Sequence, residues 1–149
     1  MRLNGTHSVY SFADVTLIIN TGIAMDPQSY TITGEGVGSI GITRATDNSQ
    51  HDVSADGSVM TSKIIAKNGA IAISVQQTSA ANHWLTKWYN KLYQSKTSEW
   101  TNNNATLVMD EDGTQVNLIG LCPQKRPDLA MQASGQQITW NLLCNEIDE

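Results

Sequence analysis

The chain has 149 residues, a formal net charge of −5 and only 15% charged residues. This length predicts a single domain over residues 1–149, with a core large enough to need no disulfide or metal staple. The acidic balance excludes a protein that grips nucleic acid through a basic face. We expect no membrane span and no secretory leader, because no apolar run approaches roughly 18 residues and residues 1–8 lack the leader pattern.

Alternating apolar and polar residues, the pattern of half-buried strands, organise the first half of the chain. The pattern predicts strands at residues 9–20, 39–44, 59–65 and 70–76, with a short strand at 30–33. Residues 46–57 form the most polar stretch, which is either a loop or the tip of a long hairpin with two polar faces. Asn68 and Gly69 predict a type I′ turn that joins the strands on either side of them.

One amphipathic helix is predicted at about residues 79–96. Ser79 suits its N-cap, because a serine oxygen can accept a bond from an early unpaired N–H group. Apolar residues recur at helical spacing and form one stripe, whereas Lys87 and Lys91 point away from it. We expect this helix to lie across a sheet and to share a core with a residue of the last strand. The predicted core residues are Trp84, Leu85, Trp88, Leu92 and Trp140.

The second half of the chain returns to the strand pattern, at residues 105–109, 116–122 and 137–144. Asp112 and Gly113 predict the turn between the first two of these strands. Cys122 and Cys144 each end a strand pattern. Buried, reduced thiols are the favoured interpretation, and a bridge between them requires the two strands to be neighbours.

Several motifs resemble nucleotide, metal or catalytic sites, but the residues around them do not fit such sites. Residues 36–41 match G-x-G-x-x-G, but a strand pattern follows where a nucleotide site needs a helix. The three histidines, His7, His51 and His83, share no ligand spacing with the cysteines. The acidic run at residues 110–112 is typical of a solvated turn, and no serine is marked as a nucleophile. We therefore expect no enzyme, no cofactor and no metal site.

Several short segments also resemble a known family. They are residues 10–15, 55–63, 67–69, 75–79, 125–129 and 144–148. In this order they are similar to the tail tube proteins of contractile-tailed bacteriophages, although residues 34–41 depart from the family pattern. The resemblance spans nearly the whole chain. It implies a mainly β fold, with β-sandwich or barrel-like antiparallel sheets and one flanking helix.

The resemblance further implies a structural subunit without catalysis. Such subunits form hexameric rings that stack into a hollow tube inside a tail sheath protein, in a virion tail assembled in the host cytoplasm. The tape measure protein and DNA would pass through the lumen without specific binding. Low charge content agrees with a surface covered by other subunits, since soluble domains carry about 25% charged residues.

Two surfaces are candidates for these contacts. Asp47, Asp52 and Asp56, on the polar stretch, are expected at the lumen or at the junction between rings, where carboxylates would weakly repel DNA. Lys87 and Lys91 are the candidate sheath-facing surface of the helix. Two alternatives stay open: a tube subunit of a secretion system or tailocin, and a carbohydrate-binding β-sandwich that uses exposed tryptophans.

Overall fold

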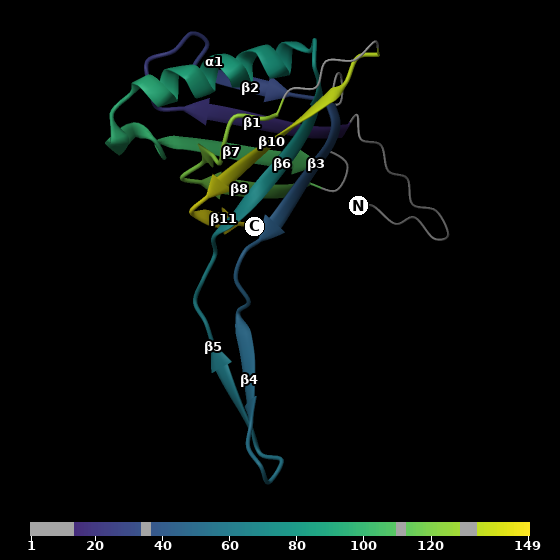
Figure 1. The fold of residues 1–149 in the computed structure, drawn as a ribbon, viewed down its shortest axis with the longest axis vertical. Coiled ribbons are helices and arrows are strands. Elements are labelled where there is room, and N and C mark those ends of the chain that lie inside the picture. Colours follow the sequence, from purple (N-terminus) through teal and green to yellow (C-terminus); the bar gives the residue numbers. More distant parts are fainter. Residues whose placement is uncertain (1–13, 34–36, 110–112, 129–133) are drawn as a thin grey trace.

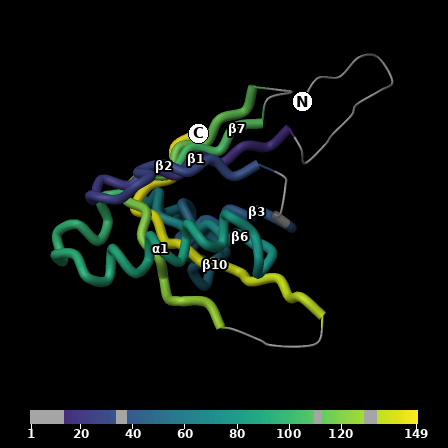
Figure 2. The backbone as a smooth tube through the Cα atoms, turned by 90° about the horizontal axis from the view of Figure 1, so that it is seen from above, coloured from purple at the N-terminus to yellow at the C-terminus, as the bar shows by residue number. Residues whose placement is uncertain are grey.

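The computed structural model describes residues 14–33, 37–109, 113–128 and 134–149, and the account below concerns these residues. Two antiparallel sheets, one of five strands and one of four, lie in two layers (Figures 1 and 2). One helix lies across one end of the layers, and a two-stranded hairpin projects far from the opposite end (Figure 1). The mainly β fold with one flanking helix is confirmed.

The five-stranded sheet has the strand order β11-β8-β7-β1-β2. Its strands are β1 (Val15–Thr21), β2 (Ser29–Ile32), β7 (Asn103–Met109), β8 (Thr114–Ile119) and β11 (Glu146–Asp148). Alternation decides which side chains point inward, because successive residues of a strand face opposite sides. Val15, Leu17 and Ile19 are therefore buried, while the residues between them are half-buried. The first part of the predicted strand 9–20 lies outside the described residues.

The four-stranded sheet has the order β3-β6-β10-β9. Its strands are β3 (Val37–Arg44), β6 (Gly69–Gln76), β10 (Gln137–Cys144) and β9 (Cys122–Pro123). Ile73 lies opposite Trp140 and Ile71 opposite Leu142, and all four side chains are buried against the other sheet. The predicted strand at 116–122 is broken, because Gly120, with φ +72°, redirects the chain from β8 in one sheet to β9 in the other.

The helix α1 (Ala80–Gln94) begins after Ser79, whose hydroxyl accepts the backbone N–H of Asn82 at 3.2 Å. It packs against both sheets: it lies close to β2 and β6, and its side chains form hydrogen bonds with Asn103 of β7 and Trp140 of β10. The residues expected in its core, Trp84, Leu85, Trp88, Leu92 and Trp140, are 5% exposed or less. A short 3₁₀ turn, η2 (Thr97–Glu99), leads from the helix to β7.

The predicted type I′ turn at Asn68 and Gly69 is wrong. Gly69 is the first residue of β6 and pairs with Arg44, and neither Asn68 nor Gly69 has a positive φ. A Cβ at Gly69 would lie 2.4 Å from both the carbonyl oxygen of Thr43 and Cδ1 of Ile147. Glycine is needed here for close approach of the neighbouring backbone, not for a turn.

The polar stretch forms the long hairpin that was one of its two predicted interpretations. Strand β4 (Ser49–Val53) pairs with β5 (Val59–Lys63), and the two strands continue β3 and β6 away from the body (Figure 1). Strand β5 thus pairs with β4 rather than with the strand that follows it. Gly57, with φ +89°, occupies the position in the tip turn that requires a positive φ.

Candidate functional site

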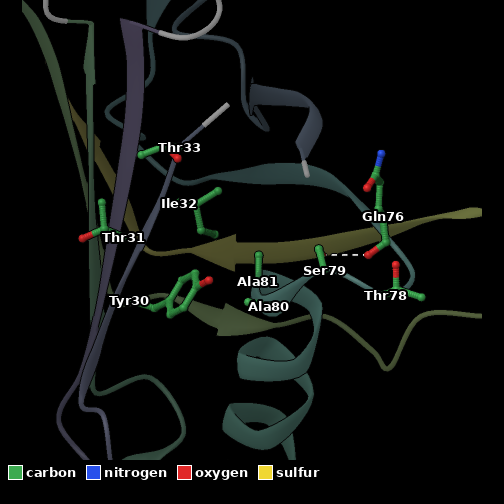
Figure 3. Close-up of a pocket in the computed structure, with 9 residues that line it drawn as sticks. All are labelled: Tyr30, Thr31, Ile32, Thr33, Gln76, Thr78, Ser79, Ala80 and Ala81. Atoms are coloured by element: carbon green, nitrogen blue, oxygen red, sulfur yellow. Dashed lines mark hydrogen bonds between the residues drawn. The ribbon is translucent and has the colours of Figure 1, made fainter. Parts of the chain in front are cut away.

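A hollow lies where the end of β2 meets the start of α1 (Figure 3). It has a volume of about 370 Å³ and is lined by Tyr30, Thr31, Ile32, Thr33, Gln76, Thr78, Ser79, Ala80 and Ala81. No carboxylate, amine, imidazole or thiol is among these side chains. The Ser79 hydroxyl is occupied as the helix cap and also donates to the Gln76 carbonyl at 2.8 Å. The hollow therefore lacks the nucleophile and base that an active site combines.

The described residues outside this hollow offer no metal site and no reactive thiol either. Among the described residues, no group of three or more His, Cys, Asp or Glu could hold a metal ion. Cys122 and Cys144 are free thiols, and burial raises the pKa of both. Cys122 pairs with Leu143, so it faces the side of the sheet opposite to Cys144. No helix in the described part of the chain is long and apolar enough to span a membrane.

The carbohydrate-binding alternative depends on exposed, coplanar tryptophans. Trp84 and Trp88 stack on one another, with ring centroids 6.0 Å apart, but both are buried. Trp140 is 1% exposed, and Trp100 is half-buried. The tryptophans form the core beneath the helix and offer no stacking platform for a sugar.

The two sheets differ in the length of their edges. In the described residues, β3 pairs on one side only, and β9 covers β10 only at Leu142 and Leu143. The four-stranded sheet thus has open backbone along β3 and along residues 137–140 of β10. The five-stranded sheet ends instead in the short strands β2 and β11, of 4 and 3 residues. Long open edges invite pairing with another chain, whereas short ones limit it.

The projecting hairpin exposes apolar side chains. Every residue of β4 and β5 is exposed, and the cross-strand pair Val53 and Val59 is 63% and 55% exposed. Met60 and Ile65 are 61% and 87% exposed. A lone two-stranded hairpin is only marginally stable in water. The hairpin therefore has the character of a segment that another molecule covers.

The candidate carboxylates all lie on or beside this hairpin. Asp47 lies in the strand-to-strand link at its base, Asp52 on β4, and Asp56 in the turn at the tip. Asp56 accepts bonds from the Ser54 hydroxyl at 2.5 Å and the Ser58 N–H at 2.9 Å. These bonds, that of Ser54 first, lower its pKa from 3.8 to about 2. The structure distributes the three carboxylates along the hairpin and does not gather them into one site.

The exposed face of α1 carries the candidate lysines. The Lys87 ammonium donates to the Asp26 carbonyl at 2.6 Å, and Lys91 is exposed one turn further on. Arg126 joins this face from the segment before β10. Its guanidinium donates to Asn90 Oδ1 at 2.6 Å and lies 5.4 Å from the Tyr89 ring centroid. This third cation was not assigned to the helix surface from the sequence, because the contact spans distant parts of the chain.

The structure also contains a buried polar residue, Asn103, that the sequence patterns did not predict. Asn103, the first residue of β7, is 1% exposed and lies where the five-stranded sheet meets the helix. Its Oδ1 accepts from the Thr21 hydroxyl at 2.6 Å and from Trp88 Nε1 at 3.2 Å. Its Nδ2 donates to the carbonyl oxygens of Trp100 and Leu121, at 3.2 and 2.8 Å. The sequence signal was weak, because Asn103 is one of three consecutive asparagines that precede a strand.

Comparison with known proteins finds similarity to phage tail tube proteins and to components of contractile injection systems. Residues 7–149 match the family model described as the bacteriophage PhiTE tail tube protein. Among solved structures, the chain is similar to a component of the anti-feeding prophage baseplate, with a TM-score of 0.60, 11% identity, and coverage of 96% of this chain and 95% of that one. No match is found among curated proteins.

Two further structures share the fold. A chain of the anti-feeding prophage tube terminating cap has a TM-score of 0.57 at 9% identity, with 99% of this chain and 94% of that chain covered. A chain of the PVC sheath-tube complex, an extracellular contractile injection system in its extended state, has a TM-score of 0.53 at 9% identity, with 97% and 92% covered. Identities this low show likeness of fold alone.

Proposed function

Since this chain belongs to the bacteriophage PhiTE tail tube protein family, we propose that its copies close into hexameric rings that stack into a hollow conduit. The chain is a structural tail tube protein and not an enzyme. In the proposed assembly, the conduit lies inside a contractile sheath in the virion tail, is assembled in the host cytoplasm, and conducts DNA. The tape measure protein and DNA pass through it without specific binding.

The open edges of the four-stranded sheet carry the proposal for the ring. Strand β3 of one copy would lie beside the open half of β10 of the next copy, which satisfies backbone groups that neither copy satisfies alone. A head-to-tail contact of this kind gives a ring where the rotation closes. Six copies are supported by the similar baseplate, whose structure is six-fold symmetrised.

The hairpin would join one ring to the next. Its direction away from the two layers suits contact with a copy beyond the ring (Figure 1). Contact there would bury Val53, Val59 and Met60, which water surrounds in the single copy. Asp47, Asp52 and Asp56 then lie at the junction between rings, the second of the two places expected for them.

The outer face of α1 is our candidate for contact with the sheath. Lys87, Lys91 and Arg126 supply three cations on this face of a chain whose net charge is −5. Such a face suits an acidic surface of a partner. Charge reversal of Lys87 and Lys91 should therefore prevent sheath assembly around preformed tubes, and an intact sheath would contradict this contact.

Electron microscopy of the purified protein tests the assembly. We expect the unchanged chain to form rings and tubes on concentration, and the double variant Val53→Ser/Val59→Ser to form rings but no long tubes. Tyr93→Ser, which removes another exposed apolar side chain from the helix, is the matched control and should form normal tubes. Long tubes from the double variant would refute the stacking role, and a wild-type chain that stays monomeric would refute the ring.

A further inference from the structure

Among the described residues, the side chains of the four-stranded sheet that face away from the core carry no charge. Register and alternation place a single set of side chains there, called the neutral face below. The neutral face comprises Ser39, Gly41, Thr43, Ala70, Ala72, Ser74, Gln76, Cys122, Gln137, Thr139, Asn141 and Leu143. Most of these side chains are small or polar, and hydroxyls of neighbouring strands bond to each other, as Ser74 and Thr139 do at 3.0 Å.

The outward side of the five-stranded sheet also carries hydroxyls and amides, such as those of Thr106, Gln115 and Asn117, but it differs in its large apolar and charged residues. Ile18 and Val108 are half-buried there, and Ile119 is 43% exposed. Acidic residues of β11, Glu146 and Asp148, lie at its edge. The two carboxylates distinguish this side from the neutral face. Its three large apolar side chains, against Leu143 alone on the neutral face, also suit contact with protein better.

The sheet edges decide which face would surround a lumen. If copies pair through β3 and β10, their four-stranded sheets form one continuous wall around the ring axis. The core side of that wall is already covered by the five-stranded sheet and α1 of the same copy. In the part of the chain that the structure describes, the other side, which is the neutral face, has no layer over it.

We propose that the neutral face is the wall of the conduit, and that its lack of charge lets a polyanion pass without being held or repelled. This inference rests on the proposed tube function and replaces an acidic lumen with an uncharged one. DNA carries one negative charge per about 1.7 Å, and each lysine that neutralises a phosphate releases counterions and binds in a salt-dependent way. A wall of hydroxyls, amides and methyls offers neither this attraction nor a repulsion, which would extend about 8–10 Å.

Thiol labelling of assembled tubes tests the orientation. Thr139→Cys and, as an outer control, Gln94→Cys are each placed in a Cys122→Ser background, where the remaining Cys144 is buried. A small maleimide should label both positions in tubes. A maleimide attached to a folded protein should label position 94 but not position 139, although it labels both in the unassembled chain. Labelling of position 139 in tubes by the large reagent would overturn the assignment of this face to the lumen.

Charge introduced into the wall tests the mechanism. Particles with Thr139→Lys should keep tails of normal length but release DNA at least about tenfold more slowly at low salt, with a deficit that shrinks as salt rises. Gln94→Lys adds the same charge to the helix and should release DNA at the wild-type rate. Gln137→Lys, at the exposed start of β10, replaces Thr139→Lys if the latter does not assemble.

The outcomes separate the two proposals. Failure of the unchanged chain to form tubes defeats the proposed function itself. Tubes that form normally, label as expected at position 139, and release DNA at the wild-type rate with a lysine in the wall defeat only the inference about charge.

Discussion

Replacement of Asn103 by leucine tests whether one buried amide holds the five-stranded sheet to the helix and to Leu121 in the link between the sheets. Leucine keeps the branching of the asparagine side chain at Cγ but carries methyl groups in place of the oxygen and nitrogen, so the change removes the hydrogen bonds. It leaves Trp88 Nε1 and the Leu121 carbonyl, both bonded to Asn103 in a buried setting, without these partners. The buried Thr21 hydroxyl loses its acceptor too, but it still accepts the Ile23 N–H at 3.4 Å, and the Trp100 carbonyl loses a bond in a part-buried setting.

The magnitude follows from the two buried groups. Each buried polar group left unpaired costs about 1–3 kcal/mol, so the pair costs about 2–6 kcal/mol. A domain of this size loses about 2–4 °C in melting temperature per kcal/mol. A cost near the middle of the range, about 4 kcal/mol, thus predicts a melting temperature about 8–16 °C lower.

Circular dichroism of the unassembled chain, with denaturant and with heat, measures this loss. Asn104→Leu is the control, because the neighbouring side chain is exposed, and it should change stability by less than about 0.5 kcal/mol. Trp88→Phe removes the indole N–H, so its effect and that of Asn103→Leu should not add. A loss below about 1 kcal/mol for Asn103→Leu, or simple additivity with Trp88→Phe, would refute the reasoning.

Two other changes test local features. Gly69→Ala places a Cβ 2.4 Å from the Thr43 carbonyl oxygen and should lower the free energy of unfolding by about 1–3 kcal/mol, measured with denaturant. Gly41→Ala is the control, because a Cβ there has nothing within 4 Å, and it should be tolerated. Equal unfolding midpoints for the two variants would contradict the packing role of Gly69. Because the pKa of Asp56 is lowered in the folded state, its carboxylate supports the turn above its ordinary pKa of 3.8, and that support is lost as pH falls through about 2. NMR titration should show a midpoint near 2 that rises toward 3.8 in Ser54→Ala, and an unchanged midpoint in this variant would be evidence against the Ser54 bond as the main cause.

Local patterns predicted much of the fold because they depend on neighbouring residues. Period-two alternation placed Ile71, Ile73 and Trp140 on the inward side of their strands, and the helical stripe placed Trp88 and Leu92 in the core. The composition of residues 46–57 indicated a hairpin with two polar faces as one of two possibilities. The mainly β character of the chain and its one helix were both available at this level.

Local sequence patterns predict which face each element buries, whereas only the folded chain shows which strands pair. The alternation of apolar and polar residues in β5 is the same whether β5 pairs with β4 or with β6, because the backbone hydrogen bonds of a strand pair do not depend on which side chains the strands carry. The glycine at position 69 suggested a turn until the Thr43 carbonyl and Ile147 were seen to occupy the space of a Cβ. Open edges, a charge-free face and the Asn103 centre each arise from residues distant in the chain, so only packing in three dimensions could bring them together.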